Sequence, residues 1–235
     1  MAEGGRKARI SIREVRSGDD PAFSAAHKLL RGAFPRSEML PQGDWKVAIR
    51  EREQGLWTDI NWHLIVAERG SKVIGAATGS YLGNVNVGVI GYVAVRSGER
   101  SSGVGPRLRK RLEKAFLYDA ERLAGEELRG ILGEVQENNP WLRHLVRREG
   151  AIALDFAYYQ PSLSAKKEPV PLVLYYQPVG DQRKSLSAAE LRRLLYTMWR
   201  RMYRVGRPLS RPEFRRMIRA LDGRRRVGQR RLEPR

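Results

Sequence analysis

Alternating hydrophobic and polar residues predict that the first half of the chain is a mixture of strands and helices. Residues 10–15 alternate apolar and polar side chains, as does a strand with one buried face. Two helices and then three strands are expected next, at residues 22–34, 41–52, 63–68, 72–82 and 87–95. Short turn sequences with glycine separate the three strands, which indicates that they form hairpins.

The second half begins where the hydrophobic period changes from two residues to that of a helix. Leu108 and Phe116 recur at helical spacing, and Arg109 is among the basic residues expected on the outer side. A strand, a short helix and two further strands are expected beyond, at residues 131–136, 139–149, 151–160 and 170–177. Two capping-box patterns, Ser187–Glu190 and Ser210–Glu213, then predict two amphipathic helices.

The composition excludes several classes of function. Hydrophobic residues make up 41% of the 235 residues, which is enough for a packed core. The chain has no cysteine, so it has no disulfide framework and no thiolate zinc site, and its three histidines form no HExxH motif. We therefore expect no metal. The longest apolar run, at residues 87–95, is too short to span a bilayer, which predicts a soluble cytoplasmic protein with no membrane partner.

Positive charge is concentrated toward the C-terminal end. The chain carries 45 Lys and Arg against 26 Asp and Glu, a net charge of +19. Residues 183–235 contribute +14 of this excess, while residues 1–182 are nearly balanced. We therefore expect a balanced domain at residues 8–180, a basic two-helix appendage at 181–223 and a disordered basic tail at 224–235.

A segment between a strand and a basic helix has the pattern of an anion site. Residues 95–105 read Val-Arg-Ser-Gly-Glu-Arg-Ser-Ser-Gly-Val-Gly. Gly103 and Gly105 allow a tight turn and a close approach of a ligand to the backbone, and N–H groups at a helix start attract negative charge. A phosphate or pyrophosphate would fit. The glycine spacing alone is equally compatible with a turn that binds nothing.

Two motifs resemble those of the GNAT acyltransferases. Residues 100–105, Arg-Ser-Ser-Gly-Val-Gly, resemble the family's Arg/Gln-x-x-Gly-x-Gly/Ala signature, and residues 134–139, Glu-Val-Gln-Glu-Asn-Asn, resemble its Glu-Val-x-x-x-Asn segment. The order of the expected elements also matches over residues 10–178. The resemblance implies an α/β fold with a mixed, mostly antiparallel central sheet, a splayed strand pair and flanking helices. The C-terminal helical appendage is added to that fold.

The resemblance also implies acetyl-CoA, or another acyl-CoA, as co-substrate. Family members hold its pyrophosphate on the amides of the loop and lay its pantetheine arm along a strand edge. The residues that match these roles are Val93, Val95, Arg100, Ser101, Ser102, Gly103, Val104, Gly105 and Asn139. A primary amine, on a small molecule or a protein, attacks the thioester directly. The activity implied is therefore N-acetyl transfer without a metal.

Glu134 matches the position where some family members, ribosomal-protein alanine acetyltransferases among them, place a glutamate, so it is a candidate general base. Burial in a strand gap would raise its pKa, which suits that role, although a surface strand glutamate with no role is the alternative. Val146 replaces the tyrosine that the family commonly uses as general acid. Tyr158 and Tyr159 are candidate substitutes or simply packed strand residues, and His144 lies on the same short helix as Val146.

The segment at residues 34–41 lies between the first two expected helices, where the family builds its acceptor site. Glu38 in this segment is a candidate to attract a cationic amine. A solvated loop residue without a role is the alternative. The sequence identifies neither the acceptor nor the acyl chain.

The C-terminal helices support a second class of function. Arginines recur along both, and Tyr196, Trp199 and Tyr203 lie among them. This pattern is typical of nucleic-acid binding, in which aromatic rings stack on bases. Alternatively, the apolar stripes pack on the domain and arginine fills the outer face. The preferred interpretation is an N-acetyltransferase. A catalytically weak CoA-binding or nucleic-acid-binding module is the alternative, and a polyanion, RNA, a ribosome or a second copy in a homodimer are candidate partners.

Overall fold

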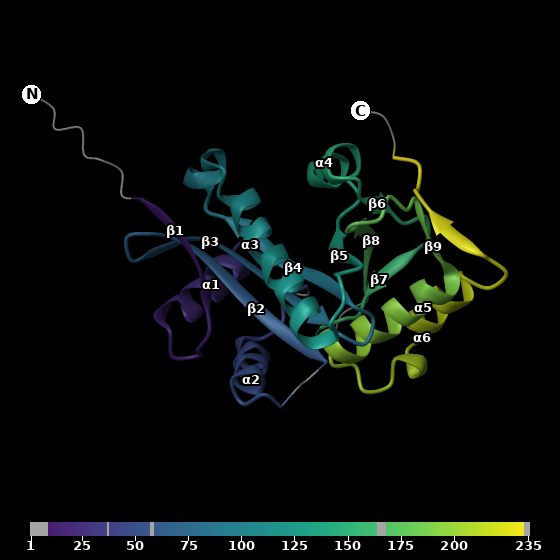
Figure 1. Cartoon of the computed structure of the whole chain (residues 1–235), viewed down its shortest axis with the longest axis horizontal. Coiled ribbons are helices and arrows are strands. Elements are labelled where there is room, and N and C mark those ends of the chain that lie inside the picture. Colours follow the sequence, from purple (N-terminus) through teal and green to yellow (C-terminus); the bar gives the residue numbers. More distant parts are fainter. Residues whose placement is uncertain (1–8, 37, 57–58, 164–167, 233–235) are drawn as a thin grey trace, which may run out of the picture.

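The computed structural model describes residues 9–36, 38–56, 59–163 and 168–232. They are built around an eight-stranded sheet of order β1-β2-β3-β4-β5-β8-β6, with β7 paired to β8 (Figure 1). The strands are β1 Ile10–Val15, β2 Ile60–Arg69, β3 Lys72–Leu82, β4 Val87–Val95, β5 Gly130–Val135, β6 Ile152–Ala153, β7 Tyr158–Gln160 and β8 Val170–Pro178. Only β4 and β5 pair in parallel among these described strands. The mixed, mostly antiparallel sheet expected from the sequence is confirmed.

Helices cover both faces of this sheet. The described α-helices are α1 Pro21–Arg31, α2 Gln42–Glu53, α3 Val104–Asp119, α4 Pro140–Arg148, α5 Ala188–Thr197 and α6 Pro212–Arg219. Leu64 and Val66 of β2 pack with α1 and α2, whereas Ile65 and Ala67 pack with α3. Alternate residues of a strand point to opposite faces, so α3 lies opposite α1 and α2. No described helix is long and apolar enough to cross a membrane.

The C-terminal helices belong to the core of the molecule. Leu191, Leu195 and Trp199 are buried in one hydrophobic cluster with Leu174 and Tyr176 of β8. α5 begins as the sequence predicts, with the Ser187 hydroxyl accepting a hydrogen bond from the backbone N–H of Glu190. α6 does not, because Ser210 ends a 3-10 turn and Arg211 takes the cap position. The apolar stripes of the two helices therefore pack on the sheet.

The expectation of a disordered tail is wrong for the described part of that segment. Strand β10, Arg226–Gly228, pairs antiparallel with β9, Ser185–Ser187, and Val227 is fully buried. Gln229 then bridges to Leu154, in the middle of the expected strand at 151–160. That strand is correspondingly broken into β6 and β7. The proposed domain start at residue 8 and the tail end at 233–235 lie outside the described residues.

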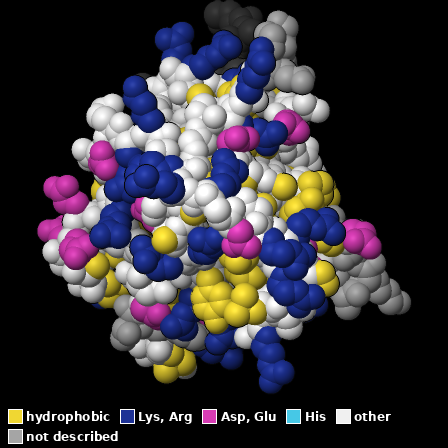
Figure 2. All heavy atoms as spheres, turned by 90° about the vertical axis from the view of Figure 1, so that its right-hand side faces the viewer, with side chains coloured by type: hydrophobic (Ala, Val, Ile, Leu, Met, Phe, Trp, Pro, Cys, Tyr) yellow, Lys and Arg dark blue, Asp and Glu magenta, His cyan; other side chains and the backbone are white. Residues whose placement is uncertain are grey.

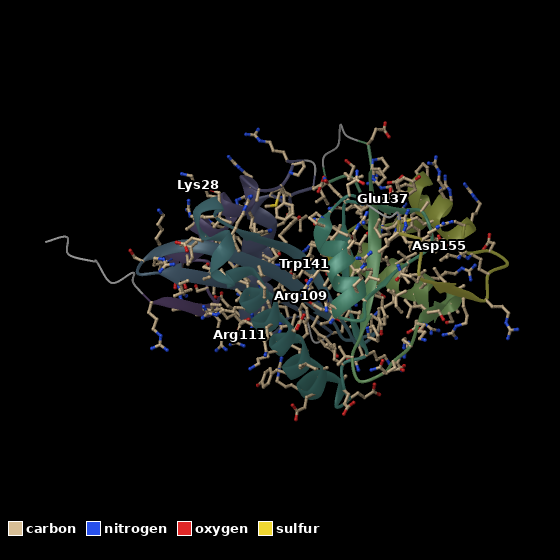
Figure 3. All side chains as sticks on the ribbon, turned by 90° about the horizontal axis from the view of Figure 1, so that it is seen from above. Lys28, Arg109, Arg111, Glu137, Trp141 and Asp155 are labelled. Carbon is tan, nitrogen blue, oxygen red and sulfur yellow. The ribbon has the colours of Figure 1, made fainter. Side chains whose placement is uncertain are left out.

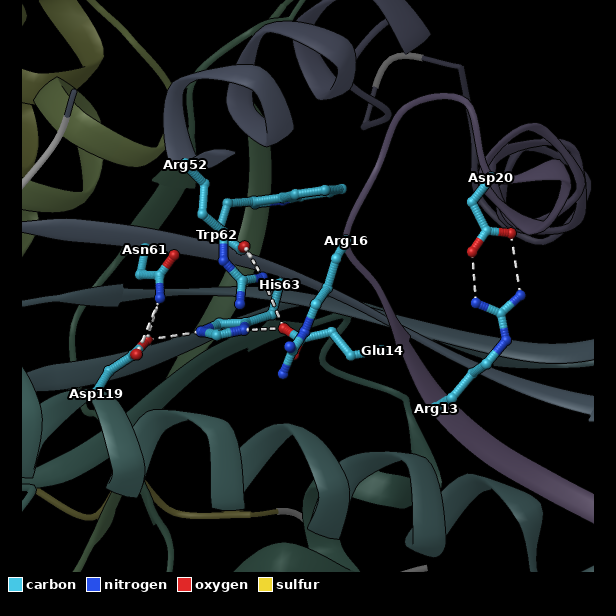
Figure 4. A network of polar contacts seen from close by, with 9 residues as sticks. All are labelled: Arg13, Glu14, Arg16, Asp20, Arg52, Asn61, Trp62, His63 and Asp119. Carbon is cyan, nitrogen blue, oxygen red and sulfur yellow. Dashed lines mark hydrogen bonds and ion pairs between the residues drawn. The ribbon is translucent and has the colours of Figure 1, made fainter. Parts of the chain in front are cut away.

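A buried network of charges ties β1, β2 and α3 together. The His63 ring lies between two carboxylates, with Nδ1 2.6 Å from Glu14 Oε1 and Nε2 2.7 Å from Asp119 Oδ2 (Figure 4). Arg52 donates to Glu14 at 2.6 Å, and Asn61 donates to both oxygens of Asp119 at 2.9 Å. Burial raises the pKa of Glu14, but the hydrogen bonds from His63 and Arg52 outweigh it and hold that pKa well below its usual value.

Candidate active site

β4 and β5 separate halfway along their length. They pair over Val87–Ile90 and Gly130–Gly133, and no pairing between their described residues continues further. Just beyond, Gly91 is an extra residue that shifts the register of β4 against β3, which makes a β-bulge and bends the strand. Residues 91–95 then line a cavity of about 480 Å³. The splayed strand pair expected from the sequence is confirmed.

Several of the expected cofactor-binding residues line this cavity. Val93 and Val95 line it from β4, Gly105 from the start of α3 and Asn139 from the start of α4. The Asn139 side chain also accepts a hydrogen bond from the backbone N–H of Trp141 at 3.0 Å, so it caps α4. A strand edge, a helix start and a capped helix thus surround a single cavity.

The loop before α3 has the geometry of an anion site. Gly103 has a φ of 68°, in the left-handed region that favours glycine, and α3 begins at the next residue. Ser97–Ser102, which includes Ser101, form a 3-10 turn in which the Ser102 hydroxyl donates to the Glu99 carbonyl. The first N–H groups of a helix lack partners within the helix and attract anions. Gly105, at the second position of α3, brings one of these groups to the cavity.

Four of the expected loop residues that the structure describes in full do not line this cavity, namely Arg100, Ser102, Gly103 and Val104. The Val104 side chain is fully buried beneath α3 and packs in the core, which leaves its backbone N–H as the group available to a ligand. Arg100 is exposed and lines a neighbouring depression together with Lys28 and Arg96. Val95 lines both hollows. The side chains of Lys28, Arg96 and Arg100 therefore place positive charge in the depression next to the cavity.

Glu134 is in the wall of the cavity, on the strand that diverges from β4. The Tyr158 hydroxyl donates to Glu134 Oε1, and the Tyr203 hydroxyl donates to Oε2 at 2.5 Å. Burial and, to a lesser extent, the negative charge of Glu38 raise the pKa of Glu134 to about 7, against the hydrogen bonds from the two tyrosines, which lower it. The carboxyl group therefore changes its protonation state near neutral pH.

The structure separates the two tyrosines proposed as acid substitutes. Tyr158 is buried and contacts Glu134, although it is not among the residues that line the cavity. Tyr159 points to the other side of β7, where the Arg216 guanidinium lies 5.7 Å from its ring centroid. Adjacent strand residues face opposite ways, so the structure does not bring Tyr159 to Glu134, and its catalytic role stays a prediction. His144 is not among the residues that line the cavity, but it stacks on Trp141, which is.

Glu38 also lines the cavity, from the segment between α1 and α2. Its backbone carbonyl accepts from the Tyr92 hydroxyl at 2.7 Å, which fixes the segment between α1 and α2 against β4. Burial raises the pKa of the Glu38 carboxyl, and a hydrogen bond from Gln136 opposes the rise. Two carboxyl groups, Glu38 and Glu134, therefore share one cavity.

Arg109 is a cavity residue that the sequence placed wrongly on the outer face of its helix. It is 4% exposed, and its guanidinium lies 2.8 Å from the carboxylates of both Glu113 and Glu149. It donates to Gln177 of β8 and lies 5.8 Å from the centroid of the Trp141 ring, beside which it is drawn in Figure 3. Arg109 therefore joins α3, α4 and the sheet behind the cavity.

Two of the three aromatic residues that the sequence offers for base stacking are buried, whereas Tyr196 is 44% exposed. Trp199 is fully buried and Tyr203 is 7% exposed, so the expected stacking on bases is wrong for both. Several arginines of this region form ion pairs within the chain, including Arg201 with Asp59. Other exposed arginines give this side of the molecule the many blue side chains of Figure 2. Contact with a polyanion through that face stays a prediction.

Comparison with known proteins agrees with this geometry. Residues 25–150, more than half of the chain, match the family model described as the Acetyltransferase (GNAT) family. No curated protein matches the chain in sequence. Solved structures resemble it in fold, among them a GNAT-family protein from Bacteroides thetaiotaomicron, with a TM-score of 0.59 and 16% identity over 83% of this chain and 99% of that one.

Two further structures extend the comparison. The ribosomal-protein-S18-alanine N-acetyltransferase from Escherichia coli has a TM-score of 0.50 and 14% identity over 74% of this chain and 96% of that one. An acetyltransferase structure from Salmonella typhimurium with its cofactor acetyl-CoA has a TM-score of 0.50 and 15% identity over 75% and 97% of the two chains. The chain belongs to the Acetyltransferase (GNAT) family, whose enzymes use acetyl-CoA.

Proposed function

We propose that the protein transfers the acetyl group of acetyl-CoA to a primary amine, with Glu134 as the general base. The observation that carries this proposal is the Glu134 carboxyl in the cavity wall where β4 and β5 separate, with its pKa raised to about 7. A base whose pKa lies near the working pH is partly ionised and still holds a proton well. Such a group suits the deprotonation of an ammonium substrate.

Residues around the cavity fit acetyl-CoA, which supplies the activated acetyl group. The edge of β4 at Val93 and Val95 would bind the pantetheine arm, and the N–H groups at the start of α3 would bind the pyrophosphate. Gly105 allows a phosphate to approach, because even a Cβ atom there would have Val95 Cγ2 at 3.8 Å as its nearest neighbour. Arg96 and Arg100 add positive charge next to the loop.

Glu134 accepts one proton from the ammonium group, and the neutral nitrogen then forms a bond to the acetyl carbon and releases its second proton to water. The carbon–sulfur bond breaks in the same process, and the sulfur leaves as a thiolate. A thiol with a pKa of about 8.5 is a tolerable leaving group near neutral pH, so the reaction does not require the tyrosine that Val146 replaces. Glu38 would hold the incoming ammonium group by charge attraction before it is deprotonated.

The acceptor is expected to be a cationic amine, because the cavity contains the two carboxyl groups of Glu38 and Glu134. Its other walls include aromatic and apolar side chains, Phe34, Tyr92 and Met202 among them. A polyamine, an amino-acid amide and a peptide with an N-terminal alanine sample this class. The last is included because a structural neighbour acts on a ribosomal-protein alanine.

The test measures CoA release from acetyl-CoA with each amine, for the wild type and for Glu134→Gln. Removal of a general base is expected to lower kcat about 10²–10⁴-fold. The matched control is Glu137→Gln, because Glu137 lies close by in the chain but is exposed and pairs with Arg230 instead of lining the cavity. Full activity in Glu134→Gln, or equal losses in both variants, would overturn the assignment of the base.

A further inference from the structure

A segment outside the matched family region enters the cavity. The family model ends at residue 150, yet Met202 and Tyr203 line the cavity beside Glu134. Tyr203 is separated from Glu134 by 69 positions, and its hydroxyl still donates to the carboxylate at 2.5 Å. The carboxyl group proposed as base therefore depends on a residue that the family region does not contain.

The backbone of this segment is held in an uncommon conformation. A π-helical turn at Met198–Met202 continues α5, and the N–H of Tyr203 donates to the carbonyl of Met198. Arg204 follows with a φ of 54°, which is unfavourable for a residue other than glycine. π-helical turns and left-handed residues are rare and tend to occur at functional sites, where surrounding contacts maintain them.

Contacts on both sides maintain this conformation. Trp199 is fully buried, with its ring 5.0 Å from the ring of Phe214. Arg201 forms an ion pair with Asp59 at 2.7 Å, and Arg204 forms one with Glu51 of α2 at 2.5 Å. Partly exposed ion pairs stabilise little by themselves, so the buried tryptophan is the main anchor. The segment is thereby fixed to the half of the molecule that carries Glu38.

Two tyrosine hydroxyls donate hydrogen bonds to the Glu134 carboxylate, one to each oxygen. Tyr158 donates to Oε1 and Tyr203 to Oε2, so both carboxylate oxygens are oriented by an O–H group. Hydrogen bonds of this kind favour the ionised carboxylate, whereas burial and Glu38 favour its protonated form. The other ionisable groups lining the cavity are Tyr92, Arg109 and Tyr175.

We propose that the C-terminal segment is part of the catalytic centre and that Tyr203 is a positioning residue, which orients the Glu134 carboxylate and favours its ionised form. This inference rests on the proposed role of Glu134 as base. It explains why a segment beyond the family region is packed into the core and carries an unfavourable backbone angle beside the cavity. It also assigns this chain a site that its family region alone cannot complete.

The test is the pH dependence of kcat/KM for Tyr203→Phe. Loss of one hydrogen bond to the charged form is expected to move the acid limb up by roughly half to one pH unit, with the KM for acetyl-CoA changed less than about twofold. The control is Tyr196→Phe, because Tyr196 is on α5 but is 44% exposed and away from Glu134. A profile unchanged in Tyr203→Phe, or shifted equally in the control, would overturn the proposal.

A second variant guards against simple misfolding. Incorporation of 3-fluorotyrosine at position 203 keeps the shape of the ring and makes its hydroxyl a stronger donor, so the acid limb is expected to move down instead of up. Opposite shifts cannot arise from a general loss of structure. Movement in the same direction as in Tyr203→Phe would contradict a positioning role.

Carbon-13 NMR of glutamate side chains separates this inference from the proposed function. The Glu134 signal, identified by its loss in Glu134→Gln, is expected to titrate at higher pH in Tyr203→Phe than in the wild type. If the Glu134 signal shifts in this way but no amine is acetylated, the proposed function is wrong and the role of Tyr203 stands. Acetylation that depends on Glu134, without the shift, would remove only the inference about Tyr203.

Discussion

Glu14 and Glu134 are two glutamates inside the domain with opposite electrostatic surroundings. Glu14 is paired with the cationic Arg52 and with His63, and its pKa is held far below the usual value. Glu134 accepts hydrogen bonds from two neutral tyrosine hydroxyls, and its pKa is about 7. Charged partners fix a carboxylate in one state, whereas neutral donors orient it and leave it able to exchange a proton.

The two glutamates show that one domain contains both a carboxylate with a structural role and a carboxyl group that can exchange a proton. The network around His63 joins β1, β2 and α3 at the far side of the sheet from the tyrosines. Its polar groups are hydrogen-bonded to one another, which suits a structural role. The site around Glu134 keeps a group whose charge state can change, at a position that lines a cavity.

The largest effect on stability is expected when the charged network is broken. Glu14→Gln leaves His63 and Arg52 without their carboxylate, and breaking a buried ion pair typically costs about 3–5 kcal/mol. Glu134→Gln replaces a titratable group among neutral donors and is expected to change stability by less than about 1.5 kcal/mol. Urea unfolding at pH 7 measures the free energy of unfolding of both variants. Equal losses would contradict the expected difference between the two glutamates.

The next largest effect is expected when a negative charge is introduced beside the backbone N–H groups at the start of α3. Wild-type protein at a hundred times the Kd of acetyl-CoA gains about 2.7 kcal/mol, and Gly105→Asp is expected to lose that gain by repelling the phosphates. The matched control is Gly43→Asp, because a Cβ atom at Gly43 meets no atom within 4 Å and the residue is outside the cavity lining.

Thermal shifts with acetyl-CoA measure this prediction. Gly43→Asp is expected to keep the wild-type shift and Gly105→Asp to show none at the same concentration. Stabilisation of Gly105→Asp to the same degree as the control would move the phosphate site away from the start of α3.

The two glutamates are also expected to give opposite pH dependences of stability. The raised pKa of Glu134 means that the folded state binds its proton more tightly than the unfolded state, so its contribution is full below pH 4.5 and is lost as pH rises toward 7. The lowered pKa of Glu14 gives a contribution that is present above pH 4.5 and is lost as pH falls.

Unfolding free energies measured from pH 3 to 8 test both signs. Glu134→Gln is expected to flatten the decline between pH 4.5 and 7, and Glu14→Gln is expected to flatten the acid loss. If Glu134→Gln changed the loss of stability at acid pH, and Glu14→Gln changed the decline between pH 4.5 and 7, the pKa shifts assigned to the two glutamates would be wrong.

Local pattern was sufficient for most of the fold. The strands at 72–82 and 87–95 are observed with the bounds expected, because their hydrophobic runs end at glycine turns. The strand expected at 151–160 is broken because Leu154 pairs with Gln229, far away in the sequence. Such long-range pairing leaves no signal in a local pattern, and it is also why the tail was expected to be disordered.

The candidate site was predicted in part for the same reason. Glu134 and the loop glycines lie in contiguous motifs, whereas Tyr203 reaches the cavity only through the packing of the C-terminal helices. A signal for Tyr203 was present, because Leu195, Trp199 and Tyr203 recur every four residues, as do residues on the inner face of a helix. Arg109 gave no such signal, since its burial depends on partners from two other elements.

The 69 positions between Glu134 and Tyr203 also set the time at which the site can form during synthesis. At a translation rate of 5–20 residues per second, roughly 3–14 seconds separate the two residues as they are made. Over that interval the nascent chain carries the family region with an incompletely ordered base. The hydrogen bonds that orient the Glu134 carboxylate are therefore expected to be completed late in the synthesis of the chain.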